Sequence, residues 1–474
     1  MKKILYIYII LLGIILAQSG GSVGTAASRE AALGDAATAT ARGVYTIGFN
    51  PANLTLGQYH SMEIATVLPL PNFSVMAGSE VMTFEDFDYF FGAKKIGSKK
   101  VGRALTDADK ARLQSLFTQG EALQSEMSLN LFSFSIQVPE IGSAFAIGIR
   151  DRFSANGLID SDLVGFALNG NEVGKKETFS NFSFESVYLR EYSFSFSKNL
   201  TSLLKKEVKS LHAGVTFKYI SGFAYGKLER ANMSIETTSD TKLHVIGDVL
   251  TRSAVSPDFG VEYDFEDITK KEDYTPFPTP AGSGFGIDLG ITAEINRAIT
   301  AAISITDIGS VNWDKETVEY RMDGEKLISD FTKKENVDSL EEIFDMKGKY
   351  IGEFSSDLAT ALHIGVKVRV DKLEGIGLDQ KLMVAFDYHQ GLNDGPFNSE
   401  DPRFSFGCEW QPAHWFMFRN GLTFGGRFGF RWSMGFGFDS GLLEFNLTTT
   451  DFNSLLLNNG AGRAGVNFGT RWKF

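Results

Sequence analysis

The sequence predicts an all-β protein, a transmembrane antiparallel β-barrel of about 14 strands. Three observations lead to this prediction. Apolar residues alternate with small or polar residues along many segments, the chain begins with an export signal, and its 474 residues include 41 Phe and 49 Gly but only 11 Pro. Such a pattern indicates strands that are apolar on one face and small or polar on the other.

The alternation is clearest in RFGFRWSMGFGFD, residues 427–439. Every even position from Phe428 to Phe438 is large and apolar, and every odd position from Arg427 to Asp439 is Gly, Ser or charged. Because successive side chains of a strand point to opposite faces, one face of this strand is entirely apolar. The same pattern recurs in 285–295, 362–370, 404–410 and 464–474.

Two kinds of protein contain such strands: a soluble sandwich with one wet face, and a membrane barrel with lipid outside and a filled or watery lumen. Three features favour the barrel. The apolar faces often last about ten residues, enough to cross a bilayer obliquely. They carry aromatic residues at their ends, and Gly and Ser with scattered charges dominate the polar faces, which suits a crowded lumen. The last strand, ending in Phe474, resembles the C-terminal assembly signal of bacterial outer-membrane barrels.

Individual strands can be placed along the chain from this pattern. We predict them at 59–68, 126–138, 142–151, 186–198, 208–222, 230–246, 283–296, 298–308, 311–321, 355–371, 379–390, 403–411, 414–424, 427–438, 441–449 and 463–474. Some pieces are expected to merge or to lie outside the membrane, which leaves an even total of about fourteen. In MSLNLFSFSIQV the apolar parity changes between Leu131 and Phe132, which predicts a β-bulge or a sharp bend.

The N-terminus has the three parts of a secretory signal peptide. Lys2 and Lys3 precede an uncharged apolar run that ends at Ala17 and is followed by polar QSGGS. The run is shorter than the roughly 20 residues of a comfortable membrane-spanning helix, although an uncleaved anchor stays an alternative. We therefore predict a signal peptide at 1–17, export of the mature chain and location in the cell outer membrane.

Composition and motifs argue against several classes of function. The single cysteine, Cys408, rules out an internal disulfide framework and a cysteine-based zinc cluster. A net charge of −12 argues against nucleic acid as a partner. No G-x-S-x-G or H-E-x-x-H motif is present, and the six histidines are scattered over different segments. We expect no catalytic residue, no cofactor and no metal, and a protein that is not an enzyme.

Long polar segments interrupt the strands. Residues 105–124 have helical spacing, a Thr106 cap and acidic residues in the first turn, and residues 325–349 look similar. Between them, residues 256–284 are polar and contain proline. We interpret these segments as excursions from the barrel, with short helices in the first two. They are solvated loops over its mouth or docking sites for a ligand or partner, and the sequence does not fix the end at which they lie.

The segment ASREAALGDAATATARGVYTIGFNPANL resembles the start of the FadL-type (long-chain fatty-acid transporter-like) outer-membrane barrels, and most closely an uncharacterised Bacteroidota-type branch. The likeness is carried by Gly34, Asp35 and Ala36, followed by Asn50, Pro51 and Ala52. Two later stretches, GFGIDLGITAEINRAITAAISITDIGSVNW and VAFDYHQGLNDGPFNSEDPRFSFGCEWQ, are similar to strands of the same group. The resemblance implies that residues 18–58 form a plug, or hatch, inside a fourteen-stranded barrel that spans 59–474.

The sequence departs from the fatty-acid transporters on the predicted inner face, where those proteins have apolar pockets. Here that face carries many charged and imidazole groups: His363, Lys367, Arg369, Asp387, His389, Glu409, Arg419, Arg427, Arg431, Glu444, Arg471 and Lys473. They either pair with one another and with the hatch, or form a basic lumen patch that attracts anionic solutes. The candidate patch is Lys367, Arg369, Arg427 and Arg431.

The resemblance implies a function in passive transport: a small molecule, which can be hydrophobic, crosses the outer membrane, and a hatch that shifts is the gate. The expected partners are outer-membrane lipid and that small-molecule solute. The alternative is a binding or scaffold protein that does not transport, such as a partner in protein secretion, with the long loops holding a secretion-system protein. The sequence does not reveal the substrate, the state of the lumen or the oligomeric state.

Overall fold

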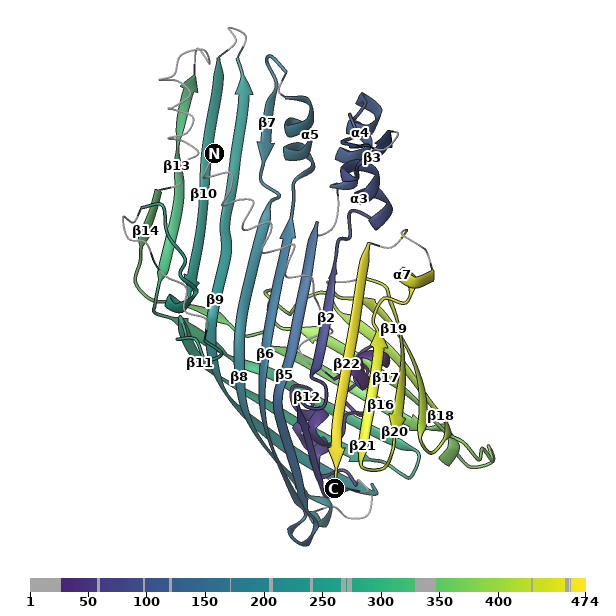
Figure 1. Ribbon diagram of the computed structural model, residues 1–474. Helices are drawn as coiled ribbons and strands as arrows, with labels where there is room; N and C mark the ends of the chain where they lie inside the picture. The colour runs from purple at the N-terminus through teal and green to yellow at the C-terminus, as the bar shows by residue number, and fades with distance from the viewer. Residues whose placement is uncertain are drawn as a thin grey trace.

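A single antiparallel sheet, closed on itself, forms the body of the protein (Figure 1). The computed structural model describes residues 27–474 apart from 58–59, 97–98, 119–121, 171, 204–207, 239–241, 266–269, 271–274, 329–346, 428, 457–459 and 461. The wall strands are β1 (Met62–Thr66), β2 (Asn72–Gly78), β5 (Leu123–Val138), β6 (Ser143–Leu158), β8 (Ser183–Asn199), β9 (Ser210–Thr237), β11 (Gly282–Glu294), β12 (Ile299–Trp313), β15 (Phe354–Asp357), β16 (Ala361–Arg369), β17 (Lys381–Gly391), β18 (Arg403–Ala413), β19 (Phe416–Gly425), β20 (Arg431–Asp439), β21 (Leu443–Thr449) and β22 (Arg463–Lys473).

Closure comes from pairing between the two ends of the chain. β1 pairs with both β22 and β5, with Glu63 opposite Lys473, and β2 pairs with the same two neighbours. β15 and β16 in turn pair with different parts of β12. These sixteen strands therefore occupy fourteen wall positions, because β1 and β2 share one and β15 and β16 share another. The predicted all-β fold and its strand number are confirmed.

The wall exposes its apolar face and buries its polar face, which is the reverse of a water-soluble protein. Along β11 buried and exposed residues alternate strictly from Gly282 to Thr292. The exposed residues include Phe285 at 73% and Ile291 at 50%, whereas Asp288 and Thr292 are fully buried. A soluble sandwich would bury the apolar face, so it is excluded. An apolar exterior around a polar interior is the arrangement of a barrel in lipid.

The connections differ sharply between the two ends of the barrel (Figure 1). At the end where Phe474 lies, neighbouring strands are joined by short segments such as 139–142, 295–298 and 440–442. The long segments 79–122, 159–182 and 314–353 all lie at the opposite end, which we call the long-loop end. In bacterial barrels the long loops face the outside of the cell.

A second, smaller sheet extends the barrel at the long-loop end. The second half of β9 continues past the wall and pairs with β7 (Lys176–Phe179) and β10 (Leu243–Val255). β10 also pairs with β13 (Thr317–Ile328), which pairs with β14 (Lys347–Tyr350). The helix α5 (Ser161–Asn169) packs on this sheet through Leu163 and Phe166, which contact the buried cluster of Phe179, Ile235 and Val245.

Three further helices and a hairpin belong to the long-loop end. They are α3 (Phe84–Phe91), the hairpin of β3 (Lys94–Ile96) and β4 (Lys99–Val101), α4 (Asp107–Leu116) and α7 (Asn453–Leu456). α4 begins at the predicted Thr106 cap, whose hydroxyl accepts a hydrogen bond from the Asp109 backbone N–H at 3.2 Å. α4 ends at Leu116, earlier than the predicted residue 124, and residues 123–124 belong to β5. Within the part of the chain that the structure describes, no helix is long and apolar enough to cross a membrane.

The predicted bulge is confirmed, and several strand bounds are corrected. The β5–β6 register shifts between Asn130 and Phe132, so Leu131 has no partner of its own. The separate strands predicted at 208–222 and 230–246 are wrong, because β9 runs unbroken through residues 210–237. The sequence pattern did not predict β2, β7, β14, α3 and α5. Each of these strands and helices is too short, or has too few apolar residues, for a period to be visible.

Two predictions fall partly or wholly outside the described residues. The predicted signal peptide at 1–17 lies outside them, as do residues 18–26 of the predicted hatch. The helix predicted at 325–349 is wrong at its ends, because residues 325–328 belong to β13 and residues 347–349 to β14. Its middle, residues 329–346, lies outside the described residues.

Candidate functional site in the barrel lumen

The N-terminal segment, residues 27–57, lies inside the barrel. It consists of the helix α2 (Ser28–Ala32), the 3-10 turns η1 (Gly43–Thr46) and η2 (Pro51–Thr55), and the turns between them. Its small and apolar side chains are almost completely buried: Ala31, Ala32, Leu33, Ala36, Ala37, Ala39, Ala41 and Ala52 have no exposed surface. Such burial in so short a segment requires contact on all sides, and here the wall provides it.

Small residues on the inner face of the wall allow this close approach. A Cβ atom added to Gly421 of β19 would collide with the backbone nitrogen of Gly34, and one added to Gly290 of β11 would collide with the Asn50 side chain. Other inward glycines with the N-terminal segment as a near neighbour are Gly214, Gly365, Gly407, Gly435 and Gly469. The N-terminal segment therefore packs on the glycine-rich polar face of the strands, and we call this packing surface its template.

A substitution at one of these contacts tests the template. We expect Gly421→Ala to lower the free energy of unfolding by about 1–3 kcal/mol, the usual cost of overpacking. The new methyl group must displace either the Gly34 backbone or the wall. The measurement is urea unfolding of the barrel in lipid vesicles, followed by heat-modifiable migration on a gel. Gly352→Ala is the matched control, because no atom lies within 4 Å of the added Cβ there; equal stability of the two variants would contradict the template.

The residues of the predicted hatch motif shape two tight turns. Gly34 and Asp35 have φ angles of 65° and 66°, in the left-handed region that favours glycine. Asn50 caps η2: its Oδ1 accepts from the Ala52 backbone N–H at 3.0 Å, and Pro51 takes the first position of the turn, where no N–H is needed. Ala36 and Ala52 are fully buried, and the Ala52 carbonyl accepts from the Ser197 hydroxyl at 3.0 Å.

Polar contacts hold the N-terminal segment to several wall strands. The Asp35 carboxylate pairs with Arg431 of β20 at 2.7 Å, and neither side chain is exposed. Arg29 pairs with Glu409 of β18 at 3.0 Å. Asp387 of β17 accepts from the Thr38 backbone N–H and hydroxyl at 2.7 and 2.6 Å. A second contact with β11 is made by the Asn50 amide, which donates to Thr292 at 3.0 Å.

The four residues of the predicted basic patch do not come together. Arg431 pairs with Asp35 in the middle of the contact with the N-terminal segment. Arg427 precedes β20 at the long-loop end, where its guanidinium donates to the Gly395 carbonyl at 3.0 Å. Lys367 and Arg369 lie near the other end of the barrel, where Arg369 forms a bidentate contact with Asp371. The four residues were predicted from the sequence to share the inner face of the wall. They nevertheless lie apart, because their positions differ in height along the barrel.

A buried cluster of charges joins β6, β9, β11 and β12 on the inner face of the wall. Lys218 of β9 pairs with Asp288 of β11 at 2.7 Å and with Asp307 of β12, and neither the Lys218 nor the Asp288 side chain is exposed. Asp307 also accepts from Arg152 of β6 at 3.1 Å. The β11–β12 register shifts at Asp288, and Asp307 has a φ of 57°, so a local irregularity turns both carboxylates toward the lysine.

Two of the predicted scattered histidines meet in this region. His363 of β16 and His389 of β17 face each other across neighbouring strands, with their Nδ1 atoms 3.2 Å apart. The Nε2 atom of His363 lies 3.0 Å from the Thr306 hydroxyl. Among the described residues, no group of three or more His, Cys, Asp or Glu side chains is placed to hold a metal ion.

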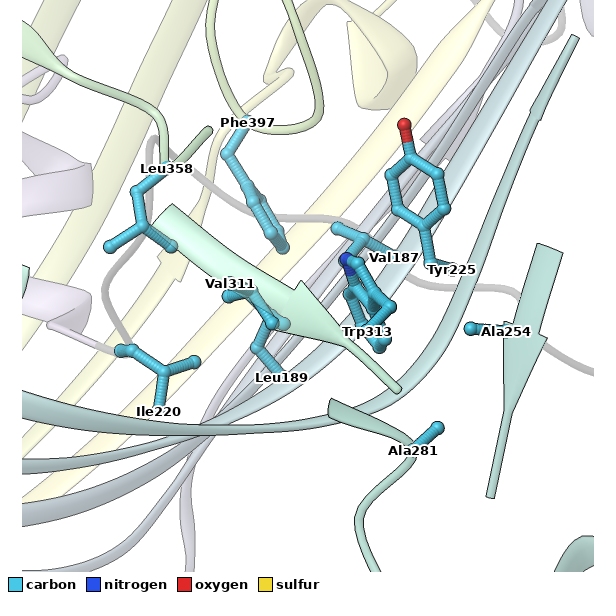
Figure 2. Close-up of a cluster of buried hydrophobic side chains, with 10 residues drawn as sticks. All are labelled: Val187, Leu189, Ile220, Tyr225, Ala254, Ala281, Val311, Trp313, Leu358 and Phe397. Carbon is cyan, nitrogen blue, oxygen red and sulfur yellow. The ribbon is translucent and has the colours of Figure 1, made fainter. Parts of the chain in front are cut away.

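A cavity of about 200 Å³ opens between this charge cluster and the long-loop end. Beside it lies a cluster of ten buried apolar side chains (Figure 2): Val187, Leu189, Ile220, Tyr225, Ala254, Ala281, Val311, Trp313, Leu358 and Phe397. The apolar lining of the cavity comes from six of them, Val187, Leu189, Tyr225, Val311, Leu358 and Phe397, and its charged lining includes Arg152, Glu185, Lys227, Glu229, Asp357 and Asp394. The cavity therefore combines apolar and charged lining residues.

Phe397 is one of the cavity-lining residues, none of which the sequence pattern singled out. It belongs to the connection between β17 and β18, has a φ of 68° and is only 4% exposed. Its ring lies 4.1 Å from the Arg152 guanidinium carbon, and Figure 2 shows it packed toward Val311 and Leu358. Asn398 fixes the connection by donating to the Thr360 carbonyl at 2.9 Å. The signal in the sequence that could have indicated Phe397 is a single aromatic residue within the turn-forming stretch NDGPFN.

The course of the chain is similar to that of several solved structures. The crystal structure of the toluene transporter TodX of Pseudomonas putida covers 97% of this chain and 99% of its own, with 10% identity and a TM-score of 0.47. A Pseudomonas aeruginosa FadL homologue covers 96% and 100%, with 9% identity and a TM-score of 0.43. The CymD monoaromatic hydrocarbon channel covers 97% and 98%, with 8% identity and a TM-score of 0.36.

No curated protein matches the sequence. A family model does match it, over residues 59–450, which include all of the wall except the last strand. The chain therefore belongs to the family of unknown function DUF5723.

Proposed function

We propose that this protein is an outer-membrane channel through which a small molecule passes without energy input, with the N-terminal segment as its hatch. The observations that support the proposal are a closed wall with an apolar exterior and a buried N-terminal segment that contacts inward-facing wall residues through ion pairs, hydrogen bonds and close packing. A hatch of this kind can shift when a few polar contacts exchange for water. The proposed path needs no catalytic group.

The cavity at the long-loop end supports a small rather than a long substrate. Its volume of about 200 Å³ lies below the roughly 300–1,000 Å³ of sites for drug-sized ligands. Its apolar lining residues suit a hydrophobic body, and its charged lining residues suit a polar group of the same molecule. In this proposal the substrate enters here, and the charge cluster around Lys218 and the N-terminal segment below it form the barrier.

Uptake into vesicles tests the proposal. We expect the purified barrel in liposomes to accelerate entry of toluene or oleate over empty liposomes, and Ala359→Trp to reduce that acceleration several-fold by filling the cavity that Ala359 lines. Ala93→Trp, on an exposed position of a long loop, is the matched control and should leave uptake unchanged. Uptake that is absent for every probe, or equal in the two variants, would count against transport through this cavity.

A second candidate function is a scaffold that binds a protein partner, such as a secretion-system component. The observation that favours it is the sheet of β7, β9, β10, β13 and β14, which projects beyond the wall at the long-loop end (Figure 1). A scaffold predicts a co-purifying protein that is lost when this sheet is replaced by short turns, with no uptake of small molecules in either form.

A further inference from the structure

The helix α3 presents a stripe of three phenylalanines to the outside of the protein. Phe84, Phe87 and Phe91 are 41%, 61% and 59% exposed. Their spacing of three and four residues puts them on one side of the helix. The rings of Phe87 and Phe91 are 5.3 Å apart, so the stripe is a continuous apolar surface. Three exposed phenylalanines within about two helical turns are unusual on a surface that faces water only.

Contacts on the opposite side of α3 hold the stripe in this orientation. Phe90 is 5% exposed, and Asp86 pairs with Arg112 of α4. The Tyr89 hydroxyl donates to the Asp109 carboxylate of α4 at 2.7 Å. Because every one of these polar contacts lies away from the stripe, α3 cannot turn its phenylalanines inward without losing them.

The position of α3 brings the stripe to the upper edge of the apolar exterior. α3 begins six residues after Gly78, the last residue of β2. The Ser79 backbone N–H donates to the Gly462 carbonyl at 2.8 Å, which ties the start of this connection to the start of β22. On β22 the outward side chain of Val466 is 39% exposed. Figure 1 shows α3 beyond the ends of β2 and β22.

The hairpin that follows α3 is strongly basic in sequence. β3 and β4 pair with Lys94 opposite Val101 and Lys95 opposite Lys100, so four lysines, Lys94, Lys95, Lys99 and Lys100, share a hairpin of two short strands. Val101, at its end, is 44% exposed. A basic segment beside an exposed apolar helix face is the composition of elements that lie on an anionic lipid surface.

We propose that α3 and the β3–β4 hairpin lie on the membrane leaflet at the long-loop end, with the phenylalanine stripe between the lipid headgroups and the hairpin against their phosphates. The occupant of the stripe is lipid, because the stripe is apolar and exposed on a helix beyond the ends of β2 and β22, and because the sequence of the adjoining hairpin has the charge that complements phosphate. This inference rests on the membrane location proposed above and is independent of transport.

Site-directed labelling tests the proposal in the full-length protein. In a Cys408→Ser background, a fluorophore on Phe87→Cys is compared with one on Asp107→Cys of α4, whose side chain is fully exposed. The protein is placed in vesicles of phosphatidylcholine and phosphatidylglycerol. The quenchers are a lipid with a nitroxide near the headgroup and, separately, iodide in the buffer. We expect the ratio of lipid to iodide quenching to be about tenfold higher at position 87 than at 107.

A third label separates failure of this inference from failure of the membrane location. Position 436 on the outer face of β20, labelled as Phe436→Cys, should be quenched by the nitroxide lipid. If it is, and position 87 behaves like 107, the interfacial role of α3 is wrong while the barrel location stands. If position 436 is not quenched, the membrane location itself is wrong.

The lysines are tested in the same assay. Replacement of Lys94, Lys95, Lys99 and Lys100 by Gln should lower lipid quenching at position 87 to the level seen in phosphatidylcholine alone. Heat-modifiable migration checks that this variant still forms an intact barrel. Unchanged quenching would show that the hairpin does not contact the lipid phosphates.

Discussion

Lys218→Met is expected to lower the free energy of unfolding by about 3–5 kcal/mol, the cost of leaving a buried charge without its partner. Lys218 is fully buried between Asp288 and Asp307, and it lies at the irregular part of the β11–β12 pair. Of the two aspartates, Arg152 pairs with Asp307 and not with Asp288, so Asp288 would lose its ion-pair partner. Urea unfolding in lipid vesicles measures the effect.

Two further variants make this prediction specific. Lys209→Met also removes a lysine that pairs with a carboxylate, Glu294, but the Lys209 side chain is 49% exposed, so its loss should cost no more than about 1 kcal/mol. Asp288→Asn added to Lys218→Met removes the uncompensated carboxylate and should recover part of the stability. A loss at Lys218 no larger than that at Lys209 would show that the buried cluster does not stabilise the barrel.

Deletion of residues 27–57 is expected to raise the single-channel conductance in planar bilayers several-fold. These residues are buried against the inner face of β9, β11, β17, β18, β19 and β20, and a barrel of fourteen strands is wide enough to hold water once they are gone. Heat-modifiable migration verifies that the shortened chain still forms a barrel.

A point substitution tests the same hatch with the chain intact. Asp387→Ala removes the two hydrogen bonds that Thr38 donates and should produce brief open events, because the N-terminal segment then keeps its other contacts. Asp439→Ala is the matched control: Asp439 pairs with Lys473 at the rim near the C-terminus, away from Thr38. Conductance that stays unchanged after the deletion would mean that the segment does not occlude the lumen.

The wall could be predicted from the sequence because each strand carries its own periodic signal. In β20 the inward residues Arg431 and Ser433 are fully buried while the outward Phe436 and Phe438 are exposed, as the alternation indicates. The bulge at Leu131 was also visible, since one extra residue reverses the parity of every apolar position after it. Short elements such as β7 and β14 gave too few residues for a period to appear.

The site was less predictable, because its contacts join residues far apart in the chain. The hatch motif was recognised by resemblance, but nothing in its letters shows that Asp35 pairs with Arg431, 396 positions away. The basic patch was predicted from a shared face, although Lys367 and Arg427 belong to opposite ends of the barrel. The charge cluster around Lys218 depends on the β11–β12 irregularity, which the sequence pattern there does not reveal.

The sequence by itself determined that strands with one apolar face would close into a barrel, because alternation is a local property that any single strand displays. Only the tertiary structure decided what fills the barrel and where charges meet. Strand register and closure set those contacts, and they fix the height of each residue along the wall. The inward glycines illustrate both contributions. Their alternation is visible in the sequence, whereas their contact with the N-terminal segment exists only in the closed barrel.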